Sequence, residues 1–289
     1  MTAMPDGSVQ YMARKKSDGF LYHNIRYSNG TLQGWAKPNG YNGAASFSGP
    51  GPAIAGMPDG SAQVVGIGLD GRLYHRIRNN DTTWTPWAQM QGRPGESTFP
   101  ARKVAIAGIG DGTAQVYAYS SDNNGLYTTT RASNGTWTAW SQVDNPGGDG
   151  GVGFGPDLAV GAGANGLAMP NNSSQFLVIG TDGKVYHILR TPTGPGGAPV
   201  YSGWGALNIS ATSVAITGMP NGSSQTLLVD QNGDLRFNIR NMNGSWTGFS
   251  QVSSPEGHAV KHAGIAGVPT NSTSQVFATP LTRQHPPTA

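Results

Sequence analysis

The stretch Met57-Pro58-Asp59-Gly60-Ser61-Ala62-Gln63-Val64 identifies the fold, because the chain contains it several times in varied form. Similar stretches begin at Met4, Met169 and Met219. The Ser/Thr-x-Gln triplet within it recurs at six positions 50 to 60 residues apart, ending at Gln10, Gln63, Gln115, Gln175, Gln225 and Gln275. A period of this length indicates that one structural unit is repeated along the chain.

Each unit contains four short segments of extended character, separated by turn residues. In the second unit these segments are Ala53–Met57, Gln63–Gly68, Leu73–Arg78 and Trp84–Met90. The Asp-Gly and Asn-rich pairs between them favour tight antiparallel turns, because these residues accept a positive φ. Four meandering strands per unit, with no helical periodicity, predict an all-β chain that folds as a single β-propeller of four-stranded blades.

The number of repeats predicts five blades, with six and seven as alternatives. Residues 1–280 should form the propeller, and 281–289 a flexible tail. The units start near residues 4, 57, 109, 169 and 219, with a partial unit at 263–280. First segments such as Ala53–Gly56 consist mostly of tiny residues, which suit the crowded centre of a ring. We expect the N- and C-terminal strands to pair and so close the ring. The surplus segment Gln275–Thr279 could cap the ring, extend a sheet edge or belong to a sixth blade.

Composition excludes several classes of function. Charged residues make up 11% of the chain, and its net charge of +3 arises from basic and acidic groups spread along it. Neither a disordered polyelectrolyte nor a nucleic-acid binder has this pattern. No apolar run is long enough for membrane insertion, and this chain shows no signal peptide. The absence of Cys excludes thiolate metal sites and thiol nucleophiles.

Catalytic groups are scarce, so we expect no enzyme, no metal site and no cofactor. Glu occurs only at Glu96 and Glu256, whereas glycoside hydrolysis needs two carboxylates facing one pocket. Most of the thirteen Asp residues stand in turns, where they close hairpins. Three His residues occupy one position in three separate units, where bonding to neighbouring backbone explains them better than metal ligation does: His23, His75 and His187.

Aromatic residues recur at two positions of the fourth segment. The later position holds Trp35, Trp87, Trp140, Trp204 and Phe249. The position three residues earlier holds Leu32 in the first unit and an aromatic ring in the next four: Trp84, Trp137, Tyr201 and Trp246. These rings either fill the wedge between blades or offer stacking platforms for sugars. Third-segment alternation places a Tyr (Tyr22, Tyr74, Tyr127, Tyr186) and an Arg (Arg26, Arg78, Arg131, Arg190, Arg240) on one face. Each Arg either ties blades together or supplies a polar arm to a sugar site.

Two segments carry a resemblance to a known family. Asp70-Gly71-Arg72-Leu73-Tyr74-His75 followed by Trp84-Thr85-Pro86-Trp87-Ala88-Gln89, and the later Asn134-Gly135-Thr136-Trp137-Thr138-Ala139-Trp140-Ser141-Gln142, resemble the repeat of bacterial PLL-like β-propeller lectins and their tectonin relatives. The repeats also resemble those of actinobacterial proteins. The resemblance covers residues 4–279. It implies several shallow sites between blades for fucose, O-methylated or galactose-type sugars. This chain departs from the family in blade number, since PLL-like members have seven blades. With Glu only at Glu96 and Glu256, it also cannot repeat the Arg/Glu pairing that fungal fucose lectins use.

Together these features predict a secreted, monomeric lectin that binds glycans on another cell at several sites. The later aromatic rings, the four Tyr and the five Arg named above are the predicted sugar-binding residues. The resemblance also implies a targeting module of a larger enzyme or toxin complex with other subunits. The alternative function is a propeller scaffold that binds a protein partner without sugar, and a hydrolase of unfamiliar type is a further rival.

Overall fold

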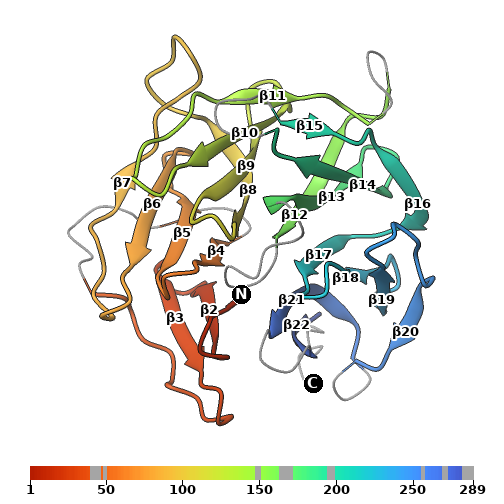
Figure 1. The fold of residues 1–289 in the computed structure, drawn as a ribbon, viewed down its shortest axis with the longest axis horizontal. Coiled ribbons are helices and arrows are strands. Elements are labelled where there is room, and N and C mark those ends of the chain that lie inside the picture. The colour runs from red at the N-terminus through yellow and green to blue at the C-terminus, as the bar shows by residue number, and fades with distance from the viewer. Residues whose placement is uncertain are drawn as a thin grey trace, which may run out of the picture.

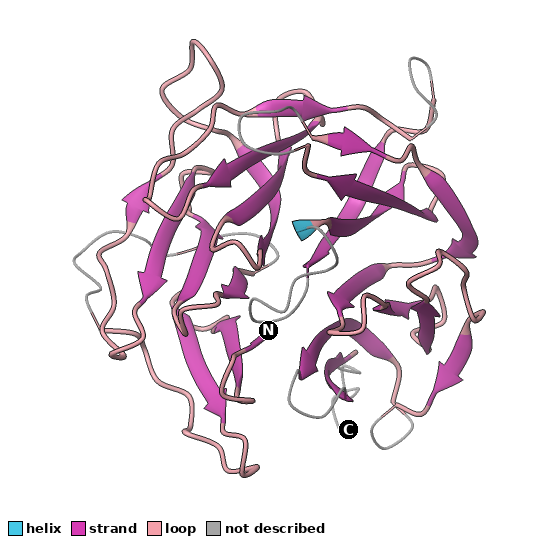
Figure 2. Cartoon of the chain, in the orientation of Figure 1, coloured by secondary structure: helices cyan, strands magenta, loops and turns pink. Residues whose placement is uncertain are grey.

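The computed structural model describes residues 1–39, 47, 51–146, 151–162, 172–193, 199–254, 258–268 and 273–281. Antiparallel sheets surround a common axis in ring order (Figures 1 and 2). The described residues contain no α-helix; the short helical piece in Figure 2 is a 3₁₀ turn at Asn172. Five of these sheets are the blades of a β-propeller, which confirms the predicted fold class and blade number. The predicted unit start at Met169 and the tail from residue 282 onward lie outside the described residues.

Each blade runs from an inner strand to an outer one in chain order. Blade 1 contains β1 (Thr2–Ala3), β2 (Val9–Arg14) and β3 (Leu21–Arg26), with isolated bridges His23–Ala36 and Arg26–Leu32 at the fourth-strand position. Blade 2 contains β4 (Ala53–Gly56), β5 (Ala62–Ile67), β6 (Leu73–Arg78) and β7 (Ala88–Gln89). Blade 3 contains β8 (Ala101–Gly108), β9 (Ala114–Ser120), β10 (Leu126–Arg131) and β11 (Ser141–Val143).

Blades 4 and 5 follow the same plan. Blade 4 contains β12 (Phe154–Ala162), β13 (Ser174–Gly180) and β14 (Lys184–Thr191), and its outer edge is shared by β15 (Val200–Tyr201) and β16 (Gly205–Ser210). Blade 5 contains β17 (Ser213–Gly218), β18 (Ser224–Val229), β19 (Leu235–Arg240) and β20 (Ser250–Val252). A sixth sheet has two strands in the described residues, β21 (Val260–Val268) and β22 (Thr273–Pro280).

The repeated Met-Pro-Asp-Gly stretch forms the turn between the first and second strands. Asp59 Oδ1 accepts hydrogen bonds from the Ser61 backbone N–H at 2.9 Å and from its hydroxyl at 2.6 Å. Gly60 in this turn has a φ of +80°, a conformation that residues with a Cβ rarely adopt. The same side-chain bonds recur at Asp6, Asp111 and Asn221. The sequence repeat is therefore a repeat of one turn.

Tiny residues in the first strands allow the inner strands to pack closely around the axis. A Cβ on Gly56 or Gly108 would come well inside 3.0 Å of a backbone carbonyl in the preceding blade, Ala3 O or Gly56 O respectively. Apolar side chains from the first three strands of neighbouring blades fill the space between the sheets. One such core joins Val65 and Leu73 of blade 2 to Val104 and Val116 of blade 3.

The ring closes differently from the expectation of paired chain ends. β1 pairs with β2 inside blade 1, and β21 pairs with β22 in the sixth sheet. Side-chain packing across the junction replaces strand pairing: Ala3 and Val9 share a core with Ala266 and Val268. Gln275–Thr279 lies in β22, which pairs only with β21 among the described residues, so this segment extends the edge of none of the five blades.

Candidate functional site

A buried His–Gln pair links the third strand to the second in three blades. The Nε2 atoms of His23, His75 and His187 lie 2.9, 3.0 and 2.7 Å from the Oε1 atoms of Gln10, Gln63 and Gln175. Because an amide oxygen only accepts, Nε2 carries the hydrogen and donates, so a neutral ring has its lone pair on Nδ1. The sequence analysis expected these His residues to bond to backbone, whereas their partner is the Gln of the repeated triplet.

Burial keeps the three His rings uncharged at neutral pH. It lowers the pKa of His23 to about 4 and the pKa values of His75 and His187 to about 3. An Arg of the following blade adds a smaller repulsion: Arg78 acts on His23 and Arg131 on His75. The interfaces between these blades therefore carry a neutral imidazole.

The earlier ring of the next blade stands edge-on to each of these His rings. The ring centroids are 5.2 Å apart for His23–Trp84, 5.1 Å for His75–Trp137 and 5.2 Å for His187–Trp246. One structural unit thus spans two blades, with a His from one and an indole from the other. This arrangement uses the aromatic position that the sequence analysis did not select for binding.

A groove lies beside one of these units, between blades 2 and 3. This blade 2–3 groove has a volume of about 890 Å³, within the range typical of ligand sites. Blade 2 contributes His75, Gln89, Gln91 and the loop at 92–97, and blade 3 contributes Thr129 and Thr136 together with Trp137 and Trp140. Aromatic surface and planar amide groups therefore face one space.

Arg93 fixes the loop that borders the blade 2–3 groove. Its Nε donates to Glu96 Oε2 at 2.8 Å, and its guanidinium forms an ion pair with Asp122 of blade 3. The hydrogen bond from Arg93 is the main reason that the pKa of Asp122 falls to about 2. The guanidinium also lies 5.0 Å from the Tyr127 ring. The Arg93 guanidinium therefore ties the loop to itself through Glu96 and to blade 3 through Asp122.

A second groove repeats this arrangement between blades 4 and 5. The blade 4–5 groove has a volume of about 300 Å³ and is bordered by His187, Asn238, Trp246 and Phe249. Asn238 occupies the strand position that Thr129 holds in blade 3. The same His, polar residue and two aromatic rings are thus assembled twice, two blades apart.

The other two interfaces between consecutive blades of the five, blades 1–2 and blades 3–4, differ at these positions. Between blades 1 and 2 the fully buried Arg76 takes the place of Thr129, and its guanidinium lies 4.6 Å from the Trp84 ring and 5.3 Å from the Trp87 ring. Its Nη2 donates to the Asn39 carbonyl at 2.7 Å. Between blades 3 and 4, Thr128 replaces the His. Residue differences between the repeat units at these positions therefore give individual interfaces different contacts.

The later aromatic rings lie mainly inside the interfaces. Trp140 is 7% exposed, packs at 4.3 Å on Phe99, and donates from Nε1 to the Gln91 carbonyl at 2.8 Å. Trp204 Nε1 donates to the Asp144 carbonyl at 2.7 Å. Trp87 and Phe249 pack partly buried in neighbouring interface cores, whereas Trp35 is 47% exposed. Only Trp140 and Phe249 of this predicted set border the two grooves.

The predicted Tyr and Arg residues lie at opposite ends of the third strands. Three Tyr hydroxyls donate to an Asp in the turn before the strand, at 2.8 to 2.9 Å: Tyr22 to Asp18, Tyr74 to Asp70 and Tyr186 to Asp182. Tyr127 accepts from Asn123 instead. The Arg stands four residues further along, about 13 Å away in an extended strand. Arg26, Arg78, Arg131, Arg190 and Arg240 are thus not gathered with the Tyr rings, and their contact with sugar stays a prediction.

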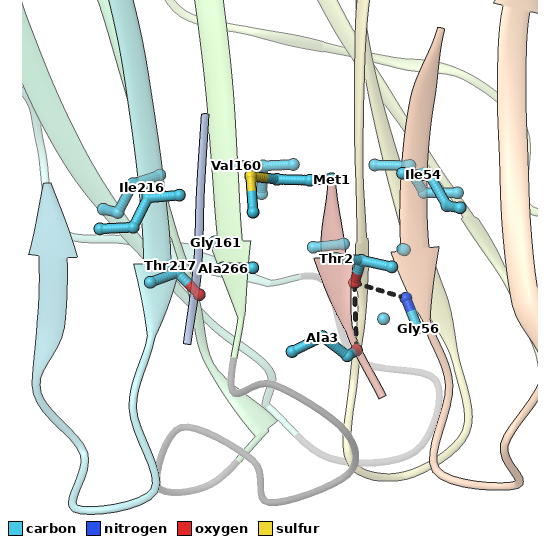
Figure 3. Close-up of a pocket in the computed structure, with 15 residues that line it drawn as sticks. Met1, Thr2, Ala3, Ile54, Gly56, Val160, Gly161, Ile216, Thr217 and Ala266 are labelled. Carbon is cyan, nitrogen blue, oxygen red and sulfur yellow. Dashed lines mark hydrogen bonds between the residues drawn. The ribbon is translucent and has the colours of Figure 1, made fainter. Parts of the chain in front are cut away.

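A small cavity of about 60 Å³ lies on the ring axis, bordered by inner-strand residues from all six sheets. Figure 3 shows Met1, Ile54, Val160 and Ile216 around it, and Thr2 Oγ1 accepts from the Gly56 N–H at 2.8 Å. This volume admits water but no sugar ring. The axis is therefore packed, and the larger spaces lie between blades.

Metal-ligating clusters and membrane-spanning helices are both missing from the described residues. No group of three or more His, Asp and Glu side chains there could hold a metal ion. No helix that could span a membrane is found in the same residues.

Solved structures similar to this chain include β-propeller lectins. The BP39L lectin from Burkholderia pseudomallei is 17% identical with a TM-score of 0.67, over 97% of this chain and 77% of the lectin. A mutant of the Aleuria aurantia lectin in complex with Fucα1-6GlcNAc is 13% identical with a TM-score of 0.63, over 96% of this chain and 86% of the lectin. The Hadza microbial sialidase Hz136 is 11% identical with a TM-score of 0.56, over 95% of this chain and 61% of the sialidase.

These similarities establish a shared propeller fold. No family model matches the chain, and no curated protein matches it. The resemblance to PLL-like and tectonin-like repeats therefore stays a prediction, although propeller lectins are among the structural neighbours.

Proposed function

We propose that this protein is a noncatalytic carbohydrate-binding lectin whose sites are the inter-blade grooves. The observation that supports this most strongly is the blade 2–3 groove, where two Trp rings share one space with amide and hydroxyl groups. A pyranose presents axial C–H bonds on one face and hydroxyls around its edge, so it needs an aromatic surface beside fixed polar partners. Fucose-binding and other lectins among the structural neighbours support the same class of ligand.

The groove residues divide the recognition between them. Trp137 is partly exposed and supplies the aromatic surface, while Trp140, which is 7% exposed, lines the same groove. Gln89 and Gln91 of blade 2 and Thr129 of blade 3 offer donors and acceptors to sugar hydroxyls. The neutral His75 ring adds an Nδ1 acceptor without adding charge, because Nε2 is bonded to Gln63. Such a site selects a neutral, hydroxyl-rich ligand.

Two grooves on one chain make binding multivalent. The blade 2–3 and blade 4–5 grooves are open together, so a surface that carries many copies of one glycan can engage both. Each additional engagement is intramolecular and raises the overall avidity without new contacts. A weak single-site affinity is therefore compatible with firm attachment to a glycan-coated cell.

We assign the carboxylates near the groove a structural role. Glu96 and Asp122 both bond to Arg93, and the low pKa of Asp122 makes it a poor general acid. Fucose, O-methylated or galactose-type sugars on a target cell are the proposed ligands. Secretion, a monomeric state and service as the targeting module of a larger enzyme or toxin complex complete the proposal.

A glycan array followed by calorimetry tests this function. The array should contain fucosylated, O-methylated and galactose-terminated glycans, and the best ligand is titrated into the protein to give stoichiometry. We expect two sites per chain, reduced to one by Trp137→Ala. Met242→Ala is the matched control, since Met242 is 69% exposed outside both grooves. An array without ligands for the folded protein would contradict the proposal.

A further inference from the structure

A further groove between blades 1 and 2 is separate from the two sites described above. This turn-side groove has a volume of about 520 Å³ and is bordered by the turn between the first and second strands of each blade. Its polar border consists of Asp6, Ser8, Gln10, Tyr27 and Gln33 of blade 1 and Asp59, Arg78, Asn80 and Thr82 of blade 2. None of these residues borders the blade 2–3 or the blade 4–5 groove. The turn-side groove is therefore a distinct space of ligand-site size.

Two carboxylates and one guanidinium border the turn-side groove without pairing with each other. Asp6 and Asp59 each use Oδ1 to accept from the backbone N–H and the hydroxyl of a Ser, Ser8 and Ser61 respectively. Within the described residues neither Oδ2 atom accepts a hydrogen bond, and the half-buried Arg78 donates none from its side chain. No ion pair within 4.0 Å joins Arg78 to either Asp, although Asp6 attracts it across the interface. These donors and acceptors are therefore available to a ligand that lies among them.

The charges around the turn-side groove favour a ligand with a positive group. Its border carries the negative charges of Asp6 and Asp59 against the single positive charge of Arg78. Two further charged residues act from outside this border, Asp81 on Arg78 and Arg131 on Asp59, and their opposite charges leave the balance unchanged. A carboxylate oxygen without a partner binds most strongly to a charged donor such as an ammonium group. We therefore expect an ammonium group beside the two Asp residues.

The other side chains of the groove suit hydroxyl groups and the apolar face of a sugar ring. The Arg78 guanidinium has five N–H donors, and the exposed amides of Gln33 and Asn80 both donate and accept. Asn80 lies over the turn of its own blade, since a Cβ on Gly60 would come 3.0 Å from its Oδ1. Tyr27 is 41% exposed and offers a ring face to axial C–H bonds. A simple amine would leave these groups unused.

We propose that the turn-side groove binds an amino sugar with a free ammonium group, such as a glucosamine unit of a de-N-acetylated glycan. The ammonium group bonds to Asp6 and Asp59, the hydroxyls bond to Arg78 and Asn80, and the apolar face of the sugar lies against Tyr27. This site does not rest on the function proposed for the two aromatic grooves, which select neutral ligands. With it, the chain distinguishes a glycan that carries free amines from a fully N-acetylated one.

Calorimetric titration with three probes tests the ligand class: a β1-4 tetramer of glucosamine, its fully N-acetylated counterpart, and tetralysine. We expect the glucosamine tetramer to bind, and the N-acetylated tetramer to bind about tenfold more weakly or less, because acetylation removes the charge. Tetralysine carries the amines without the hydroxyls and should also bind more weakly. Equal affinity for the two sugar tetramers, or for tetralysine and the glucosamine tetramer, would overturn the assignment of an amino sugar.

The chain itself offers a replacement that removes the charge and keeps the turn. In blade 5, Asn221 stands at the position of Asp59, and its Oδ1 accepts the same two hydrogen bonds from Ser223. Asp6→Asn/Asp59→Asn should therefore fold normally and bind the glucosamine tetramer about tenfold more weakly, as expected for the loss of charge-assisted hydrogen bonds. Asp111→Asn, in the equivalent turn of blade 3, is the matched control and should bind as the unchanged chain does. Undiminished binding by the double variant would overturn the proposal.

Arg78→Gln tests the hydroxyl contacts, and Arg240→Gln, at the same strand position of blade 5, is its control. Arg78→Gln should weaken binding of the glucosamine tetramer about threefold or more, whereas the control should not. Removing a cation would strengthen the binding of a simple amine, so unchanged or tighter binding would overturn the hydroxyl contacts. Saturation with the strongest neutral array ligand should leave the affinity for the glucosamine tetramer unchanged, and competition would overturn the separate site. A glycan array without neutral ligands contradicts the aromatic grooves alone, so the two proposals fail separately.

Discussion

Acidification should destabilise the propeller through its buried His–Gln pairs. His23, His75 and His187 are 6 to 8% exposed, and burial lowers their pKa values to between about 3 and about 4. In the unfolded chain an ordinary His titrates near 6.5. The unfolded state therefore binds more protons than the folded state between these values. Stability is fully present above pH 6.5 and falls as the pH drops through this window.

The magnitude follows from the size of the window. At pH 5 the unfolded chain sits about 1.5 units below the ordinary His pKa, and the folded state stays neutral at these three positions. Each unit is worth about 1.4 kcal/mol, so each His should lower the free energy of unfolding by about 2 kcal/mol between pH 8 and pH 5. The comparison ends at pH 5 to stay above the range in which carboxylates titrate.

Urea unfolding followed by Trp fluorescence at pH 8 and pH 5 measures this effect. His75→Gln should show a loss between the two pH values that is smaller than that of the unchanged protein by about 2 kcal/mol. His258→Gln, at an exposed position, should match the unchanged protein. If His75→Gln loses as much stability on acidification as the unchanged chain, the neutral His–Gln pair is not the source of the pH dependence.

Two further predictions concern packing and site number. Gly108→Ala should lower the free energy of unfolding by about 1 to 3 kcal/mol in urea titrations, because its Cβ would meet the Gly56 carbonyl. Gly71→Ala is a useful comparison, since a Cβ there meets open space and the only strain comes from a φ of +75°. Equal stability of Gly108→Ala and the unchanged protein would contradict the close inner packing. Arg76→Thr should open the blade 1–2 interface and raise the number of glycan sites per chain by one. The reason is that Thr129, which holds the equivalent position in blade 3, lies beside the blade 2–3 groove. An unchanged stoichiometry in a folded variant would show that Arg76 does not block a site.

The fold was predictable because its signals are local and repeated. The Asp59–Ser61 turn depends on residues adjacent in sequence, and the same side-chain bond occurs in four turns of the structure. Alternation along Leu73–Arg78 correctly separates the His face from the Arg face of the strand. The way in which the ring closes was harder to predict from sequence. An extended segment such as Gln275–Thr279 has the same local residue pattern whether it extends a sheet edge, caps the ring or belongs to a partial blade.

The candidate site was predictable only in part. Sequence position identifies two aromatic rings per blade but does not say which one the preceding blade covers. Trp140 is covered by Phe99, which comes from a loop between blades and has no repeat signature. The Arg93–Glu96 loop likewise stands outside the repeat. The His–Gln pair did leave a signal, because the two residues recur together at a spacing of 12 or 13 residues in three units.

Glycan recognition in repeated inter-blade grooves is best tested by calorimetric titration of the strongest array ligand into three proteins. These are the unchanged chain, Trp137→Ala and the double variant Trp137→Ala/Trp246→Ala. We predict a stoichiometry of two, then one, then no measurable binding, with the circular dichroism of the propeller retained throughout. Undiminished binding by the folded double variant would contradict recognition in these grooves.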